Sequence, residues 1–192
     1  MKNRNFQYLN SIADISEDVF DLLKDISELK IMTEGTQLVK FNEVPTKVYM
    51  LVSGLVRCYL TTEEGREYNK SFYLPLSFVA SLTALMNKKP SKFVFECLSD
   101  CELFEIDYCR LMELCKQSSQ VNRLYTKVLE MLYTKYERRL VELISLNARD
   151  RYLALRAQIP ELDVIIPQYH IASYLGITAV QLSRIRKKMG GH

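Results

Sequence analysis

The residues best suited to a chemical task lie in the last quarter of the chain. Gln168–Leu175 has the pattern of a short helix, Gly176 permits a tight turn, and Thr178 can cap a second helix that runs to about Met189. The second helix would turn small residues and then long polar ones outward: Ala179, Val180, Gln181, Ser183, Arg184, Lys187 and Lys188. Such a face can approach the base edges of DNA in the major groove.

Each side chain on this face suits a different contact with DNA. The guanidinium of Arg184 matches the two acceptors of guanine, and Val180 suits a thymine methyl group. Gln181 suits either a base edge or a phosphate, while Ala179 lets the backbone come close. The remaining candidates are polar groups that would hold phosphates, namely Gln168, Tyr169, Thr178 and Lys188. Two short amphipathic helices joined by a glycine also occur in ordinary helical bundles, so that alternative stays open.

The charge distribution separates the C-terminal end from the rest. Residues 148–192 contain seven Lys or Arg and three Asp or Glu, a net charge of +4 within a chain of net charge +3. The first 147 residues are therefore nearly neutral, at −1. A basic end on a neutral body is the asymmetry expected where one end meets phosphate.

The side chains needed for metal or acid–base catalysis are scarce. His170 and His192 are the only histidines, and the predicted β region contains none. The five cysteines are odd in number and lack the Cys-x-x-Cys spacing, which favours reduced, buried thiols: Cys58, Cys97, Cys101, Cys109 and Cys115. Glu43, Glu96 and Glu105 are more easily interpreted as solvated or hydrogen-bonded than as a catalytic pair. We expect neither a metal site nor an enzyme.

The elements that must position the C-terminal motif begin with a β-rich region. A short amphipathic helix is expected over residues 12–26, with Ser16 as N-cap. The period then falls towards two, with strands expected over residues 37–41, 47–52, 55–61, 67–74, 93–98 and 102–106, and a helical turn within 76–85. Short strands without long crossovers indicate an antiparallel sandwich or jelly roll.

A long helix follows the β region. Its apolar stripe runs over about six turns from Val121 to Leu143 without Gly or Pro. One small β domain cannot cover so long a stripe, which predicts a second copy of the helix as its partner. The expected dimer seam consists of Leu124, Val128, Met131 and Leu132. The alternative is a helix packed wholly within its own monomer.

Three stretches of the chain resemble the cyclic-AMP receptor protein and fumarate-nitrate regulator (Crp/Fnr) family. Residues 49–57 (YMLVSGLVR) and 64–67 (EGRE) are similar to its first hairpins, and residues 102–107 (ELFEID) to the strand that leaves its β domain. Residues 171–178 (IASYLGIT) and 182–185 (LSRI) resemble its helix-turn-helix with the recognition arginine. The resemblance covers nearly the whole chain.

The resemblance implies a particular architecture. It is an α+β chain with an N-terminal antiparallel jelly roll of the cyclic-nucleotide-binding type over residues 1–116, a dimerisation helix over 117–146 and a helix-turn-helix domain over 147–192. It also implies homodimers on double-stranded DNA with two-fold symmetry, with half-sites about one helical turn apart, and RNA polymerase as a candidate partner. No apolar run reaches the roughly 20 residues that span a bilayer, so we expect a cytoplasmic protein without a membrane partner.

The family's nucleotide cassette is degenerate in this chain. Where cyclic-nucleotide members carry a Gly-Glu pair, this sequence has Ala80 and Ser81, and Ser91 stands in place of the arginine that neutralises the phosphate. Lys92 is one position off and should point the other way, while Phe93 would crowd the pocket. A buried anion without a cation is unfavourable, so we expect no cyclic AMP at this site.

The sequence also lacks the residues with which other members of the family bind an iron–sulfur cluster or haem. No cysteine precedes Cys58, which disfavours an iron–sulfur cluster of the family's type, and neither histidine lies in the β region to hold haem. The expected regulator thus has an unknown ligand or none. Most members add a β wing after the recognition helix, whereas this sequence is expected to have no complete wing. The alternative function is a small-molecule binding module with a vestigial helix-turn-helix.

Overall fold

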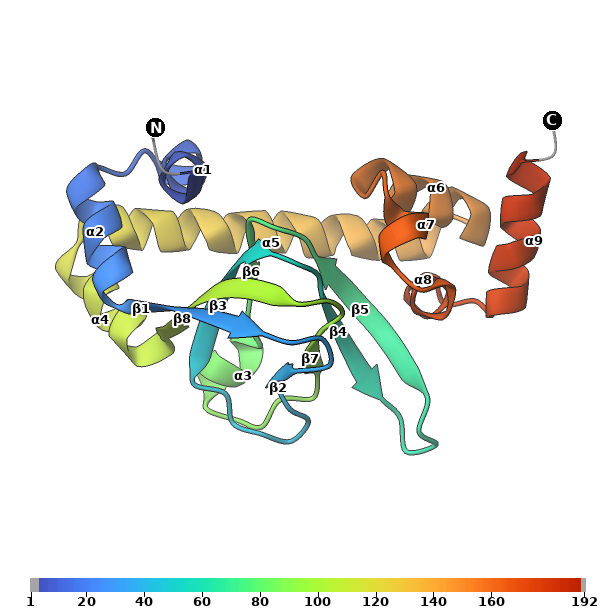
Figure 1. Ribbon diagram of the computed structural model, residues 1–192, viewed down its shortest axis with the longest axis horizontal. Coiled ribbons are helices and arrows are strands. Elements are labelled where there is room, and N and C mark those ends of the chain that lie inside the picture. Colours follow the sequence, from blue (N-terminus) through green and yellow to red (C-terminus); the bar gives the residue numbers. More distant parts are fainter. Residues whose placement is uncertain (1–3, 191–192) are drawn as a thin grey trace. The chain divides into compact units, whose positions relative to one another are not determined.

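The computed structural model describes residues 4–190 and divides the chain into two units (Figure 1). The first unit consists of Met1–Cys58 and Phe72–Tyr133, and the second of Tyr59–Ser71 and Thr134–His192. The long helix α5, Ser119–Ser145, runs from one unit into the other. None of the helices within residues 4–190 is long and apolar enough to cross a membrane.

Two four-stranded sheets form the β domain, as the alternating pattern predicts. One has the order β1-β8-β3-β6, the other β2-β7-β4-β5. Their strands are β1 (Ser27–Met32), β2 (Gln37–Val39), β3 (Lys47–Ser53), β4 (Val56–Thr61), β5 (Glu67–Tyr73), β6 (Ser77–Val79), β7 (Val94–Cys97) and β8 (Cys101–Asp107). Strand β8 pairs antiparallel with both β1 and β3, and β2 pairs antiparallel with β7. The expected α+β class with an antiparallel β domain is confirmed.

The sequence pattern missed two strands. β1 and β6 carry mixed polar and apolar residues, and both are held by backbone pairing to neighbours that are distant in sequence. The expected strand over residues 37–41 is shorter, because it ends at Val39 and Phe41 is exposed. The expected helical turn is α3, Leu82–Asn87.

The core of the β domain contains three of the five cysteines. Cys58, Cys97 and Cys101 are buried in one apolar cluster with Leu51 and Leu103. All five cysteines are free thiols, although Cys109 is exposed and Cys115 only partly buried. The prediction of buried, reduced cysteine is therefore correct for the three in the β domain.

Three helices pack on the start of α5 in the first unit. They are α1 (Arg4–Ala13), α2 (Glu17–Asp25) and α4 (Tyr108–Gln117), and their apolar faces share a second cluster with Val121 and Leu124. The single helix expected over residues 12–26 is interrupted at Asp14, which has a left-handed backbone (φ 46°). Ser16 caps α2 as predicted, since its hydroxyl accepts a hydrogen bond from the backbone N–H of Val19.

The second unit is helical apart from the hairpin segment Tyr59–Ser71. It contains α6 (Ala148–Gln158), α7 (Leu162–Ile165), α8 (Gln168–Leu175) and α9 (Ala179–Gly190). Its core is a set of fully or almost fully buried side chains: Tyr152, Leu155, Leu162, Ile166, Ile171, Leu175 and Leu182. This core supports the motif formed by α8 and α9.

Candidate nucleic-acid interface

The turn between α8 and α9 has the geometry expected of a helix-turn-helix. Gly176 adopts a left-handed conformation (φ 69°) and ends α8, and the N–H of Ile177 bonds to the carbonyl of Ala172 at 3.0 Å. Ile171, Ala172 and Leu175 are buried, as predicted from their spacing. The small side chain of Ala172 lies on the inward side, where two crossing helices need room.

A reciprocal pair of hydrogen bonds fixes the start of α9. The hydroxyl of Thr178 accepts from the N–H of Gln181 at 3.2 Å, and the side-chain oxygen of Gln181 accepts from the N–H of Thr178 at 2.9 Å. This is a capping box. The prediction that Thr178 caps α9 is confirmed, and the side-chain oxygen of Gln181 is already used within the protein.

The side chains that the helical spacing of the sequence predicts on the outward face of α9 are exposed. Leu182 is fully buried and Ile185 and Met189 are partly buried, while the exposed residues are Ala179, Val180, Gln181, Ser183, Arg184, Lys187 and Lys188. The helix contains no acidic residue. Arg184, Lys187 and Lys188 form no ion pair with any residue in the described part of the chain. The face is therefore positively charged and open to a ligand.

The residues expected to hold phosphates differ in their surroundings. Tyr169 is exposed, whereas Gln168 is partly buried and its side-chain N–H donates to the carbonyl of Ala179 at 2.9 Å. This bond ties the first turn of α8 to the first turn of α9. Gln168 and Gln181 thus have positions within the motif that the sequence did not predict.

A polar network anchors α9 to α6 and α7. The hydroxyl of Tyr152 donates to a carboxylate oxygen of Asp163 at 2.6 Å, and Arg186 donates both to that hydroxyl and to the other carboxylate oxygen. Arg156 adds an ion pair to Asp163 at 3.6 Å. Burial and then the bond to Asp163 raise the pKa of Tyr152 above its ordinary value, which is itself far above neutral, so its hydroxyl is a donor at neutral pH. Arg186 is therefore a structural residue, although in the sequence it counts only as one of the seven basic residues of positions 148–192.

Replacing Tyr152 by phenylalanine tests this anchor. The substitution removes the hydroxyl between Asp163 and Arg186, and we expect the free energy of unfolding to fall by about 1–3 kcal/mol because a charge-assisted hydrogen bond is lost in a buried place. Urea denaturation followed by circular dichroism measures it. The matched control is Tyr169→Phe, since Tyr169 is exposed; equal stability of the two variants would contradict a stabilising network.

The hairpin segment of the second unit contacts α8 through polar groups. The hydroxyl of Ser173 accepts from the N–H of Asn69 at 3.0 Å and donates to the carbonyl of Glu67 at 2.7 Å. The side-chain amide of Asn69 lies 3.3 Å from Nδ1 of His170, and both residues are buried. No periodicity in the sequence pointed to these contacts, because they join positions about a hundred residues apart. These hydrogen bonds determine which side of α8 faces the hairpin segment.

The two serines of the degenerate nucleotide cassette lie next to each other in the β domain. Ser81 and Ser91 are buried, and their hydroxyls hydrogen-bond to each other at 2.8 Å. Phe93 packs against the core of the β domain, and Lys92 is exposed, as expected. Residues 91–93 precede β7, so the exposure of Lys92 arises from a bend and not from strand alternation. These residues do not fit a cyclic nucleotide phosphate, because the hydroxyls of Ser81 and Ser91 are neutral and are bonded to each other.

A buried ion pair in the β domain went undetected in the sequence. Arg57 and Glu96 are joined at 3.1 Å, with only 6% and 17% of their side chains exposed. Glu96 was expected to be solvated or hydrogen-bonded, and the structure shows it to be hydrogen-bonded in a charged pair. Breaking a buried pair is strongly destabilising, so these charges are structural.

The apolar surface of α5 lies further along the helix than the expected seam. Leu124 is buried in the first unit's own cluster and Val128 packs against that cluster, while Met131 is exposed and Leu132 partly buried. A more regular exposed stripe follows at Tyr133 (67%), Tyr136 (37%), Leu140 (56%) and Leu143 (48%). Spacings of three, four and three residues give these positions the a and d pattern of a coiled coil.

Comparison with known proteins agrees with this architecture. The family model of the cyclic nucleotide-binding domain matches residues 29–118. The chain is 28% identical over 184 residues to the anaerobic regulatory protein of Aggregatibacter actinomycetemcomitans, a match that covers 89% of this chain and 70% of that protein.

Solved structures share the fold at lower identity. FixK2 from Bradyrhizobium japonicum superposes with a TM-score of 0.74 at 19% identity, covering 85% of this chain and 84% of that one. A transcriptional regulator of the Crp/Fnr family from Eubacterium rectale gives a TM-score of 0.71 at 16% identity, covering 95% and 87%. The likeness therefore extends through the β domain, the long helix and the C-terminal helices.

Proposed function

We propose that this protein is a homodimeric transcriptional regulator that binds specific DNA sequences without cyclic AMP. The chain carries a cyclic nucleotide-binding domain and has the fold of Crp/Fnr regulators. The observation that carries the proposal is the exposed, acid-free face of α9 on a rigidly anchored helix-turn-helix. Small residues at the start of the helix let the backbone approach the bases, and Arg184 reads guanine.

The phosphate contacts follow from what surrounds the motif. Lys187 and Lys188 are exposed cations near the end of α9, and Tyr169 presents its hydroxyl from α8. Gln181 contributes its side-chain N–H to DNA while its oxygen stays in the capping box. These groups place the protein on the duplex, and Arg184 and Val180 select the sequence.

The dimer forms through the exposed stripe on α5. Tyr133, Leu140 and Leu143 are exposed positions in a heptad pattern, which is the surface that a parallel copy of the same helix covers. Tyr136 lies at the edge of this surface, where Lys70 sits over its ring at 4.7 Å. Two recognition helices related by a two-fold axis bind half-sites about one helical turn apart. Dimerisation therefore determines the length and symmetry of the operator.

The residues at the degenerate cassette support independence from cyclic AMP. Ser81 and Ser91 are neutral, buried and bonded to each other, and the ring of Phe93 packs against the core of the β domain. Burying that anion without a cation would be strongly unfavourable. Sensing, where it occurs, uses another ligand or another site.

Selection of DNA fragments on the purified protein, with and without cyclic AMP, tests the proposal. We expect a palindromic sequence to be enriched equally in both arms. Enrichment that requires the nucleotide would contradict the interpretation of Ser81 and Ser91. Absence of any enriched sequence, with binding that does not respond to salt, would favour the small-molecule binding module in place of a regulator.

A further inference from the structure

Two arginines hold the C-terminal end of α8, the helix that leads into the turn of the helix-turn-helix. The last carbonyl groups of a helix have no partner within the helix, and cations are favoured near them. In α8 the carbonyl of Tyr174 accepts a hydrogen bond from Arg139 of α5. The carbonyl of Leu175 accepts one from Arg151 of α6 at 3.1 Å. Two other helices therefore fix the end of α8 directly before Gly176.

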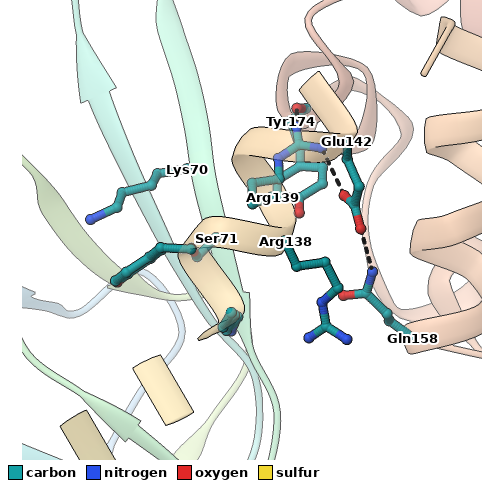
Figure 2. Close-up of a pocket in the computed structure, with 9 residues that line it drawn as sticks. Lys70, Ser71, Arg138, Arg139, Glu142, Gln158 and Tyr174 are labelled. Carbon is teal, nitrogen blue, oxygen red and sulfur yellow. Dashed lines mark hydrogen bonds and ion pairs between the residues drawn. The ribbon is translucent and has the colours of Figure 1, made fainter. Parts of the chain in front are cut away.

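Arg139 makes several contacts at once (Figure 2). Its guanidinium stacks on the ring of Tyr174, 3.9 Å from the centroid, and donates to the carbonyl of the same residue. It also pairs with Glu142 at 3.4 Å, and the two side chains are only 15% and 11% exposed. Glu142 in turn accepts from the side-chain amide of Gln158 at 3.2 Å. This group of four side chains joins α5, α6 and α8, and a stacked, paired guanidinium leaves the joint little freedom.

The same turns of α5 carry the stripe proposed as the dimer interface. Leu140 and Leu143 are exposed, and they directly follow Arg139 and Glu142 in the chain. Consecutive residues point about 100° apart around a helix with 3.6 residues per turn. One side of this segment thus holds α8, while another side is open to a second copy. The helix-turn-helix is therefore bonded directly to the segment of α5 that would form the dimer.

We propose that Arg139 is a positioning residue that sets which spacing of half-sites the dimer accepts, an inference that rests on the proposed regulator function. With each helix-turn-helix fixed to α5, the separation of the two recognition helices has a narrow range, and only one spacing lets both of them bind. A looser hold on α8 would allow several spacings, but ordering the motif on binding would then cost affinity. The contacts of Arg139 therefore sharpen the preference for one spacing and raise the affinity at that spacing.

Titration of a series of operators, whose half-sites are moved apart or together by one base pair at a time, tests the proposal. Two variants are compared with the wild type: Arg139→Gln removes all contacts of the guanidinium, and Tyr174→Leu removes only the stack. For the wild type we expect a change of one base pair to weaken binding by about tenfold or more, because both recognition helices no longer bind at once. In both variants this ratio should fall to about threefold or less, while the base preference within each half-site stays the same.

The matched control is Arg138→Gln, which removes the same charge from the neighbouring position. Arg138 is exposed, and Figure 2 shows its guanidinium pointing in a different direction from that of Arg139. This control should keep the spacing preference of the wild type. Thermal unfolding shows whether each variant is folded, and Tyr174→Leu decides the question if Arg139→Gln is not.

Two results would overturn the proposal. One is a wild-type spacing ratio in Arg139→Gln and Tyr174→Leu, even at lower stability, which would make these contacts purely structural. The other is an equal loss of spacing preference in Arg138→Gln, which would assign the effect to the charge of α5 and not to the hold on α8. A wild type that selects no DNA sequence would contradict the regulator function itself, and this inference with it, so the two failures are distinguishable.

Discussion

Substituting Leu140 by glutamate should convert the proposed dimer into monomers and weaken binding to a two-fold operator by about 100-fold or more. Leu140 is an exposed apolar residue in the middle of the heptad stripe on α5, and two glutamates facing each other across the seam would repel. A dimer gains affinity because the second half-site is bound intramolecularly, an advantage of about 10²–10⁴. Sedimentation velocity and a DNA-binding titration measure the two effects.

The matched control for this variant is Ile31→Glu. Ile31 is even more exposed, at 74%, but lies on β1 and not on the stripe. It introduces the same charge at an exposed apolar position, so the variant should stay dimeric and bind DNA as the wild type does. A Leu140→Glu protein that remained a dimer would exclude the C-terminal part of α5 as the dimer interface. It would favour the seam expected from the sequence, which includes Met131 and Leu132.

Replacing Arg184 by alanine should reduce specific DNA binding by about 10- to 100-fold, corresponding to about 1–3 kcal/mol, and should relax preference at one base pair of each half-site. Arg184 is exposed on α9 and has no ion-pair partner among the described residues. Its loss should leave stability unchanged. Binding selection with randomised half-sites measures the change in preference position by position.

Lys188→Ala is the contrasting variant. It lies one turn further along the same exposed face, and as a phosphate contact it should weaken binding to all sequences alike and lower the salt slope by about one. If Arg184→Ala behaves in the same way as Lys188→Ala, then Arg184 holds a phosphate and reads no base.

The recognition motif was predictable because its determinants are local. A helix period, a glycine that can adopt a positive φ and a hydroxyl at the N-cap lie within about twenty residues. The structure has Gly176 at φ 69° and Thr178 bonded to Gln181 as that pattern requires. By contrast, β1 and β6 are held by pairing with strands far along the chain, and no local alternation marks them.

The sequence pattern of α5 could not show which of its apolar residues are available for dimerisation. The apolar stripe on α5 is continuous in the sequence from Val121 to Leu143, and nothing local distinguishes residues that face α1, α2 and α4 from residues that face outward. The tertiary structure buries Leu124 in the first unit and leaves Leu140 exposed. Only the packing of other helices decides which part of the stripe stays free for a second chain.

The sequence by itself determined the order of most elements, the basic α9 and the replacement of the cassette's charged residues by Ser81 and Ser91, because periodicity, capping and residue type act over a few positions. Only the tertiary structure decided that Arg186 anchors α9 through Asp163 and that Arg57 pairs with Glu96. These contacts join residues 23 and 39 positions apart. Their formation depends on how the helices and strands pack, which no local pattern of side chains specifies.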